Sequence, residues 1–247
     1  MEMTLLEIVQ DILNDLDSDF VNSIDDTVEA QQVAQIVKTS YYEMIGNRNW
    51  PHLRKLVQFE ASGALSKPNY LRIPNGTKEV SYVVYDCRKD GETSSKEREM
   101  KYYAPEDFLR KLALRSVSDS TVEVSDFNGV KLKVINNKAP EFYTSFDDKY
   151  LVFDSFDSEV DDTLKKSKSS GLAYITPAWV HEDGAYPDLP SDAFSALLEE
   201  AKSTAFLALK QTANQKAEQK ASRQQRWLSR KAWRVNGGVT YKIYGRK

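Results

Sequence analysis

The densest group of side chains that could do chemistry is a run of carboxylates in the middle of the chain. Paired carboxylates can serve as general acid and base in hydrolysis, and their oxygens can ligate a divalent cation. The run lacks the glycine and terminal glutamate of an ion-binding loop. We therefore expect turns and solvated strand edges rather than a catalytic or metal site. The acids are Asp147, Asp148, Asp154, Asp157, Glu159, Asp161 and Asp162.

Other residues that catalysis needs are scarce. The chain has two histidines, His52 and His181, and one cysteine, Cys87. A Cys/His metal site and an internal disulfide are therefore excluded, and a Ser–His–Asp triad has little to be built from. We expect His52 to be a packing residue at a lobe junction and Cys87 to be a strand residue. With neither a glycine-rich phosphate loop nor a nucleophile elbow, the sequence predicts a protein that is not an enzyme and needs no cofactor.

Basic residues gather at the C-terminal end. Residues 214–247 hold ten Lys and Arg and one acid, a net charge of +9, which leaves −12 for the rest of a chain whose net charge is −3. Such an arm could bind nucleic-acid phosphates and stack bases, lie on an acidic protein partner, or be a solvated helix face. Two interleaved tryptophans favour an interface. The predicted partner-binding residues are Arg223, Arg226, Trp227, Arg230, Trp233, Arg234, Tyr241 and Tyr244.

The element that must carry this arm is residues 191–234, which no Gly or Pro interrupts. Pro190 before it and Gly237 after it predict one long helix, about 60 Å at 1.5 Å per residue. Its first half carries an apolar stripe, whereas from Asn214 onward almost nothing is apolar until Trp227. We expect the second half to project or to meet a partner, and the body to fold without it.

The N-terminal region predicts two more helices. A capping box, Thr4 to Glu7, starts the first, and the second ends at Gly46. Both are amphipathic and joined by a short acidic loop, so they should pack antiparallel with residues 194–209 as the third wall. Ile36 and Leu198 are expected core positions.

The middle of the chain reads as β structure. Alternating runs flank the turn Asn128-Gly129, which predicts a hairpin, and a second hairpin should turn at Asp147-Asp148. The predicted fold class is α+β: an antiparallel helical bundle from both chain ends, an inserted β-rich lobe and a long projecting C-terminal helix. The predicted domains are residues 1–50 with 190–234, residues 51–189, and a docking tail, residues 235–247, in which 239–244 alternates like a strand.

Three short stretches stand between or beside the predicted elements. They are Asn49-Trp50, Tyr70-Leu71-Arg72-Ile73-Pro74 and Phe153-Asp154-Ser155-Phe156-Asp157. With two N-terminal helices, a β insertion and a long closing helix, they resemble the head-to-tail adaptors, or tail tubular protein A family, of short-tailed bacteriophages. That resemblance implies a ring, dodecameric in the family, below the portal, with genomic DNA passing through it without sequence-specific contact. It also implies the portal and a downstream tail or nozzle protein as partners, and a place in the virion neck after synthesis in the host cytoplasm. A larger middle, residues 86–120, and the basic tail depart from shorter members.

Two functional hypotheses follow from the residues and the resemblance. The first is a structural head-to-tail adaptor, for which an acidic body suits a channel that must not grip DNA phosphates. The alternative is a nucleic-acid-binding protein that uses the basic arm directly. No apolar run approaches a membrane span and the N-terminus lacks a basic signal-peptide start, so we expect a soluble protein from a reducing compartment with no membrane partner.

Overall fold

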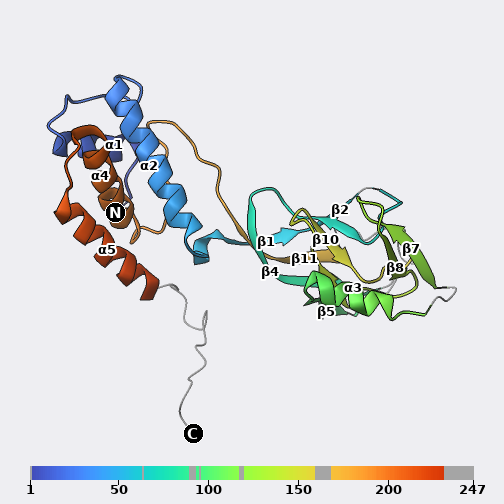
Figure 1. Cartoon of the computed structure of the whole chain (residues 1–247). Coiled ribbons are helices and arrows are strands. Elements are labelled where there is room, and N and C mark those ends of the chain that lie inside the picture. Colours follow the sequence, from blue (N-terminus) through green and yellow to red (C-terminus); the bar gives the residue numbers. More distant parts are fainter. Residues whose placement is uncertain are drawn as a thin grey trace, which may run out of the picture. The chain divides into compact units, whose positions relative to one another are not determined.

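A computed structural model describes residues 2–62, 64–88, 93–94, 96–116, 120–158 and 168–230, without the side chains of residues 229 and 230. The fold is mixed α+β and divides into two compact units (Figure 1). The helical unit comprises Met1–Leu53 and the chain from Pro177 onward, and the β unit is Arg54–Thr176. Helices of the first unit are α1 (Leu5–Asp15), α2 (Val28–Gly46), α4 (Phe194–Lys210) and α5 (Gln215–Arg230), with a 3-10 turn, η1 (Pro51–Leu53).

The N-terminal caps form as the sequence predicts. The Glu7 amide donates to Thr4 Oγ1 at 3.2 Å, and the Thr4 amide donates to Glu7 Oε2 at 2.7 Å, which completes the capping box of α1. Thr27 caps α2 by accepting from the Ala30 amide at 3.1 Å. Each cap satisfies backbone donors that the first turn leaves without a helical partner.

Helices α1, α2 and α4 contact one another through apolar stripes. Val37 and Leu197 are fully buried, whereas the expected core positions Ile36 and Leu198 are only half-buried. At the edge of this core Lys202 Nζ lies 2.8 Å from an Asp11 carboxylate oxygen and 2.7 Å from one of Asp15, so one ammonium joins α4 to two successive turns of α1.

The prediction of a single helix over residues 191–234 is wrong. α4 starts at Phe194 and ends at Lys210, where Gln211 adopts a left-handed conformation with φ of 53°. Asn214 then starts α5 by accepting the Ala217 amide at its side-chain oxygen, at 3.1 Å. Asn is a preferred N-cap, so this residue favours a new helix start over a continuous helix.

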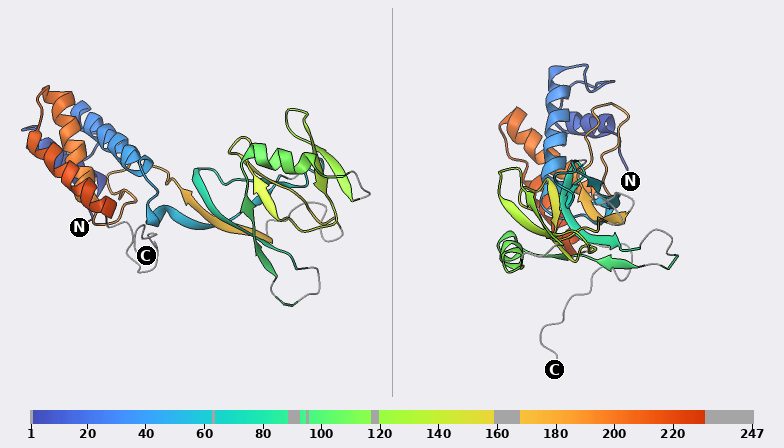
Figure 2. Two further views of the ribbon diagram at one scale, coloured as in Figure 1. Left: turned by 60° about the horizontal axis from the view of Figure 1, so that its bottom comes forward. Right: turned by 90° about the vertical axis from the view of Figure 1, so that its right-hand side faces the viewer.

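The prediction that the second half lacks core contacts is also wrong, because α5 folds back and runs beside α4 (Figures 1 and 2). Ala217, Ala221 and Leu228 share one face at helical spacing, and all three are buried. Alanines on that face allow close approach of the two helices. The reversal therefore replaces a projecting arm with a packed helical pair.

In its described residues, the β unit contains one short helix, α3 (Pro105–Ala113), and three sheets. Pro105 occupies its first turn, with Glu106 and Asp107 at the positive end of the helix dipole. The sheet orders are β1-β11-β4-β5, β2-β3-β10-β9-β6 and β7-β8. The strands are β1 (Arg54–Gln58), β2 (Glu60–Ala61), β3 (Tyr70–Arg72), β4 (Thr77–Asp86), β5 (Glu97–Glu99), β6 (Lys101–Tyr102), β7 (Thr121–Ser125), β8 (Lys131–Ile135), β9 (Phe142–Thr144), β10 (Tyr150–Phe153) and β11 (Ser169–Ile175).

Both predicted hairpins are confirmed: β7 pairs with β8 around Asn128-Gly129, and β9 pairs with β10 around Asp147-Asp148. β5 pairs with the end of β4. The sequence predicted no strand over Ser169–Ile175, yet these residues form β11, which lies between β1 and β4. A Cβ at Gly171 would lie 2.2 Å from the Tyr82 carbonyl oxygen and 2.8 Å from the Phe59 ring, so this strand position requires glycine.

Candidate partner-binding groove

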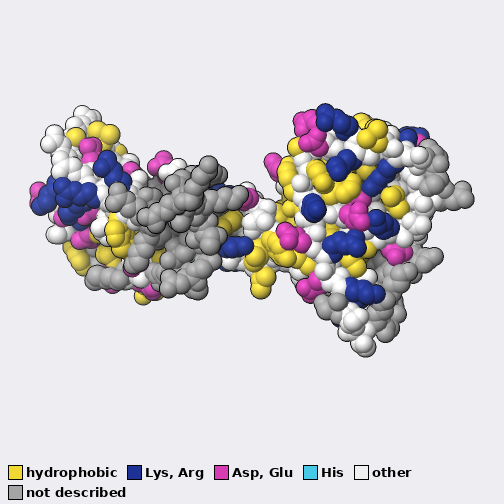
Figure 3. All heavy atoms as spheres, turned by 90° about the horizontal axis from the view of Figure 1, so that it is seen from below, with side chains coloured by type: hydrophobic (Ala, Val, Ile, Leu, Met, Phe, Trp, Pro, Cys, Tyr) yellow, Lys and Arg dark blue, Asp and Glu magenta, His cyan; other side chains and the backbone are white. Residues whose placement is uncertain are grey.

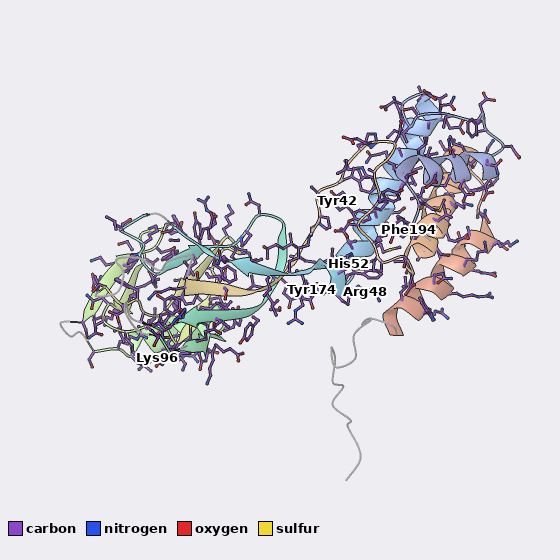
Figure 4. All side chains as sticks on the ribbon, turned by 180° about the vertical axis from the view of Figure 1, so that it is seen from behind. Tyr42, Arg48, His52, Lys96, Tyr174 and Phe194 are labelled. Atoms are coloured by element: carbon purple, nitrogen blue, oxygen red, sulfur yellow. The ribbon has the colours of Figure 1, made fainter. Side chains whose placement is uncertain are left out.

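An open groove of about 610 Å³ lies between α4 and α5 in the helical unit. Phe194, in the first turn of α4 (Figure 4), and Leu198 contribute apolar surface. Arg223 and Trp227 lie four residues apart on α5, so they share one face of that helix and line the groove. The Trp227 side chain is 43% exposed, which leaves a large apolar ring in contact with solvent. The remaining lining residues are Met3, Ser191, Asp192, Ser195 and Gln224.

Polar contacts beside the groove hold α5 against α4. Lys220 Nζ donates to Glu199 Oε1 at 2.7 Å, and Gln225 Nε2 donates to Glu200 Oε2 at 3.1 Å. Burial raises the pKa of Glu200 above its ordinary value, and the nearby carboxylates Glu43 and Glu218 raise that pKa further. Lys220 is therefore engaged in an ion pair within the fold. The raised pKa of Glu200 means that a negative charge is disfavoured at its position between α4 and α5.

The structure brings together only some of the predicted partner-binding residues. Arg223 and Trp227 line the groove, and Arg226 is exposed on the same helix. Arg230 is the last residue of α5, and its side chain is not described. Trp233, Arg234, Tyr241 and Tyr244, and with them the docking tail, lie outside the described residues.

The sequence did not predict the apolar floor of the groove as a binding surface. Phe194 and Leu198 were interpreted only as parts of a core stripe, because a single long helix offers no second wall. The Asn214 cap signal could have identified the helix break. With that break, the spacing of Ala217, Ala221 and Leu228 would have predicted that α5 returns along α4.

The most buried of the candidate catalytic acids has a structural role. Asp154 Oδ2 lies 2.6 Å from Arg115 Nη2, and the Asp154 carboxylate also accepts the amides of Glu141 and Phe142 at 2.9 and 3.1 Å. Arg115 Nη1 in turn donates to the carbonyls of Lys133 and Asp154. This network satisfies a buried charge pair and joins β9 and β10 to the segment after α3.

Two other candidate acids, Asp147 and Asp157, lie in a turn and in a β-bridge. The Asp147 carboxylate accepts the amides of Lys149 and Tyr150 in a turn, and the backbone of Asp157 pairs with that of Asn137 in an isolated β-bridge. Glu159, Asp161 and Asp162 lie outside the described residues. Among the residues described, no three His, Cys, Asp or Glu side chains come together to hold a metal ion. Burial raises the pKa of the half-buried Cys87 thiol, which disfavours the reactive thiolate.

Residues just beyond α2 form a packing corner (Figure 4). The Arg48 guanidinium lies 3.6 Å from the centre of the Trp50 ring, and burial lowers the pKa of Arg48. Trp50 Nε1 donates to the Met44 carbonyl at 3.0 Å, and His52 Nε2 lies 2.9 Å from the Asp188 carbonyl. The contacts are those of structural packing and stabilise the end of α2.

No protein-family model matches the chain, and no curated protein matches it. Within the part of the chain that the structure describes, no helix is both long enough and apolar enough to span a bilayer.

Proposed function

We propose that this chain is a head-to-tail adaptor of a short-tailed bacteriophage, a structural virion protein that forms a ring below the portal and lets genomic DNA pass. The observation that carries the proposal is the groove on the helical unit, where Arg223 and the exposed Trp227 flank the apolar side chains of Phe194 and Leu198. A partner segment with an apolar side chain next to a carboxylate would fit this groove. In this proposal the portal supplies that segment.

The antiparallel bundle of both chain ends, with the β unit inserted between them, is part of the same proposal. Contacts among α1, α2 and α4, the division of the chain into two units and the acidic remainder of the sequence support it. Net negative charge on a channel protein disfavours retention of DNA.

The alternative, direct nucleic-acid binding by α5, is favoured by one observation: α5 carries Lys216, Lys220, Arg223, Arg226 and Arg230 against one acid, Glu218. Lys220 is already paired with Glu199. On the face of the β unit seen in Figure 3, basic, acidic and apolar side chains are interspersed.

Electron micrographs of the purified protein mixed with portal particles test the proposal. We expect rings stacked on the portal. We also expect the isolated protein to show no strong, salt-dependent binding of DNA. Absence of rings together with salt-dependent DNA binding would reject the adaptor in favour of the alternative.

A further inference from the structure

The two larger sheets of the β unit separate at one point and leave a cleft. The Met100 amide donates to the Val83 carbonyl at 2.9 Å, and this is the last rung between β4 and the chain that continues into β6. In the described part of the chain no strand pair joins β4 to β6 beyond it. Two adjoining hollows of about 430 and 650 Å³ follow, and both are lined by Ser81, Tyr102 and Tyr143.

One wall of the cleft presents backbone groups that could accept another strand. Lys101 and Tyr103 donate their amides to the Glu141 and Tyr143 carbonyls of the β9 side. Because successive residues of a strand direct their amides to opposite sides, the Tyr102 amide and carbonyl face away from β9. Across the cleft, Val80 to Tyr82 of β4 have β11 as their strand neighbour on one side only.

The lining of the cleft is aromatic and apolar. Tyr102 is 58% exposed and Tyr82 is 38% exposed, while Ile73, Val80 and Leu151 lie deeper in the same lining. Burial, with Tyr102 and Glu99 nearby, raises the pKa of Tyr143 to about 12, so its ring stays neutral and apolar in character. The lining also carries Lys78, Glu79 and Asp148, a net charge of −1.

We propose that this cleft binds an extended strand from a second copy of the chain, and that this strand is residues 239–244. An inserted strand would pair with β4 on one side and with β6 on the other, which would join the two sheets into one. The inference deepens the proposed function, since it rests on the ring to bring the second copy into reach.

The sequence of residues 239–244 fits the cleft in length, pattern and charge. Six alternating residues match the six from Thr77 to Tyr82. Val239, Tyr241 and Ile243 would lie on one face, toward the apolar lining, and Lys242 on the other face, near Glu79 and Asp148. The sequence around the segment predicts no hairpin mate for it.

Hydrogen exchange on the full chain tests the proposal. We expect the Tyr102 amide, and those amides of Val80 to Tyr82 that do not already face β11, to become protected as protein concentration rises. Tyr241→Pro should abolish that protection, because proline removes a backbone donor and fits a strand interior poorly. Gly245→Pro, a proline placed just outside the segment, should leave the protection intact.

Three other exchange results overturn the inference, and micrographs separate its failure from that of the adaptor. Protection that never depends on concentration but disappears in Tyr241→Pro would place the strand in its own chain. Protection that persists in Tyr241→Pro would assign the cleft to another occupant, and no protection at any concentration would mean that the cleft binds only solvent. Rings in micrographs without protection would reject strand donation but keep the adaptor, whereas protection without rings would reject the adaptor alone.

Discussion

Helices α4 and α5 lie side by side, yet the sequence holds them in place by different means. α4 buries residues along its length, among them Phe194, Leu197 and Ala201. Among the described side chains of α5, those of Ala217, Ala221 and Leu228 are buried, and Lys220 and Gln225 add polar contacts. The comparison teaches that a helix can be packed against its own fold and still present most of its surface, including Arg223 and Trp227, to a partner.

The largest loss of stability is expected when the buried charge pair in the β unit is broken. Arg115→Met should lower the free energy of unfolding by about 3 to 5 kcal/mol, because it leaves the Asp154 carboxylate buried without its cation. Chemical denaturation monitored by circular dichroism measures this. Arg110→Met, which removes an exposed arginine of α3, is the control and should change little. Equal effects of the two variants would contradict the structural role of Asp154.

The next largest loss of stability is expected from truncation of a core residue of α4. Leu197→Ala should lower the free energy of unfolding by about 2 to 5 kcal/mol, because Leu197 is fully buried and its truncation leaves a cavity. Leu207→Ala, on the same helix but 63% exposed, is the matched control. An unchanged thermal midpoint for Leu197→Ala would show that α4 is not a core helix.

The α5 seam should respond less strongly. Ala221→Leu should lower the free energy of unfolding by about 1 to 3 kcal/mol, since extra methylenes would force α5 away from α4. Ser222→Leu places the same side chain on the exposed face and should have little effect. If both variants melt like the unaltered protein, α5 does not pack on α4, and a projecting arm becomes the better description.

Charge at the seam should give a small, pH-dependent effect. The raised pKa of Glu200 means that its ionised form is disfavoured in the fold, so stability is gained as pH falls through that raised pKa. Glu200→Gln should raise the free energy of unfolding at pH 7 by less than about 1 kcal/mol, because the carboxyl is partly solvated. The gain should vanish at a pH low enough to protonate Glu200. A gain that is the same at both pH values would exclude this electrostatic cause.

Local elements could be predicted from the sequence because their signals are short-range. The Thr4 to Glu7 capping box and the Asn128-Gly129 turn each act within a few residues. β11 could not be predicted in this way, because Ser169-Ser170-Gly171 suggests a turn and its neighbours β1 and β4 are distant in sequence.

Part of the groove could be predicted from the sequence. Arg223 and Trp227 stood out as charged and aromatic residues on a polar helix, but their apolar counterparts belong to another helix. The missing step was the reversal at Gln211 to Asn214, which turns one helix into two packed helices. A tertiary groove depends on such a reversal, and spacing along a single helix cannot show it.

The central claim is that the exposed face of α5 serves a partner and contributes little to folding. Trp227→Ala in the full chain tests it most directly, with Leu207→Ala as an exposed apolar control on α4. We predict that Trp227→Ala keeps its thermal midpoint close to that of the unaltered protein, yet fails to assemble on portal-containing heads, while Leu207→Ala assembles normally. Normal assembly by a folded Trp227→Ala variant would contradict the account.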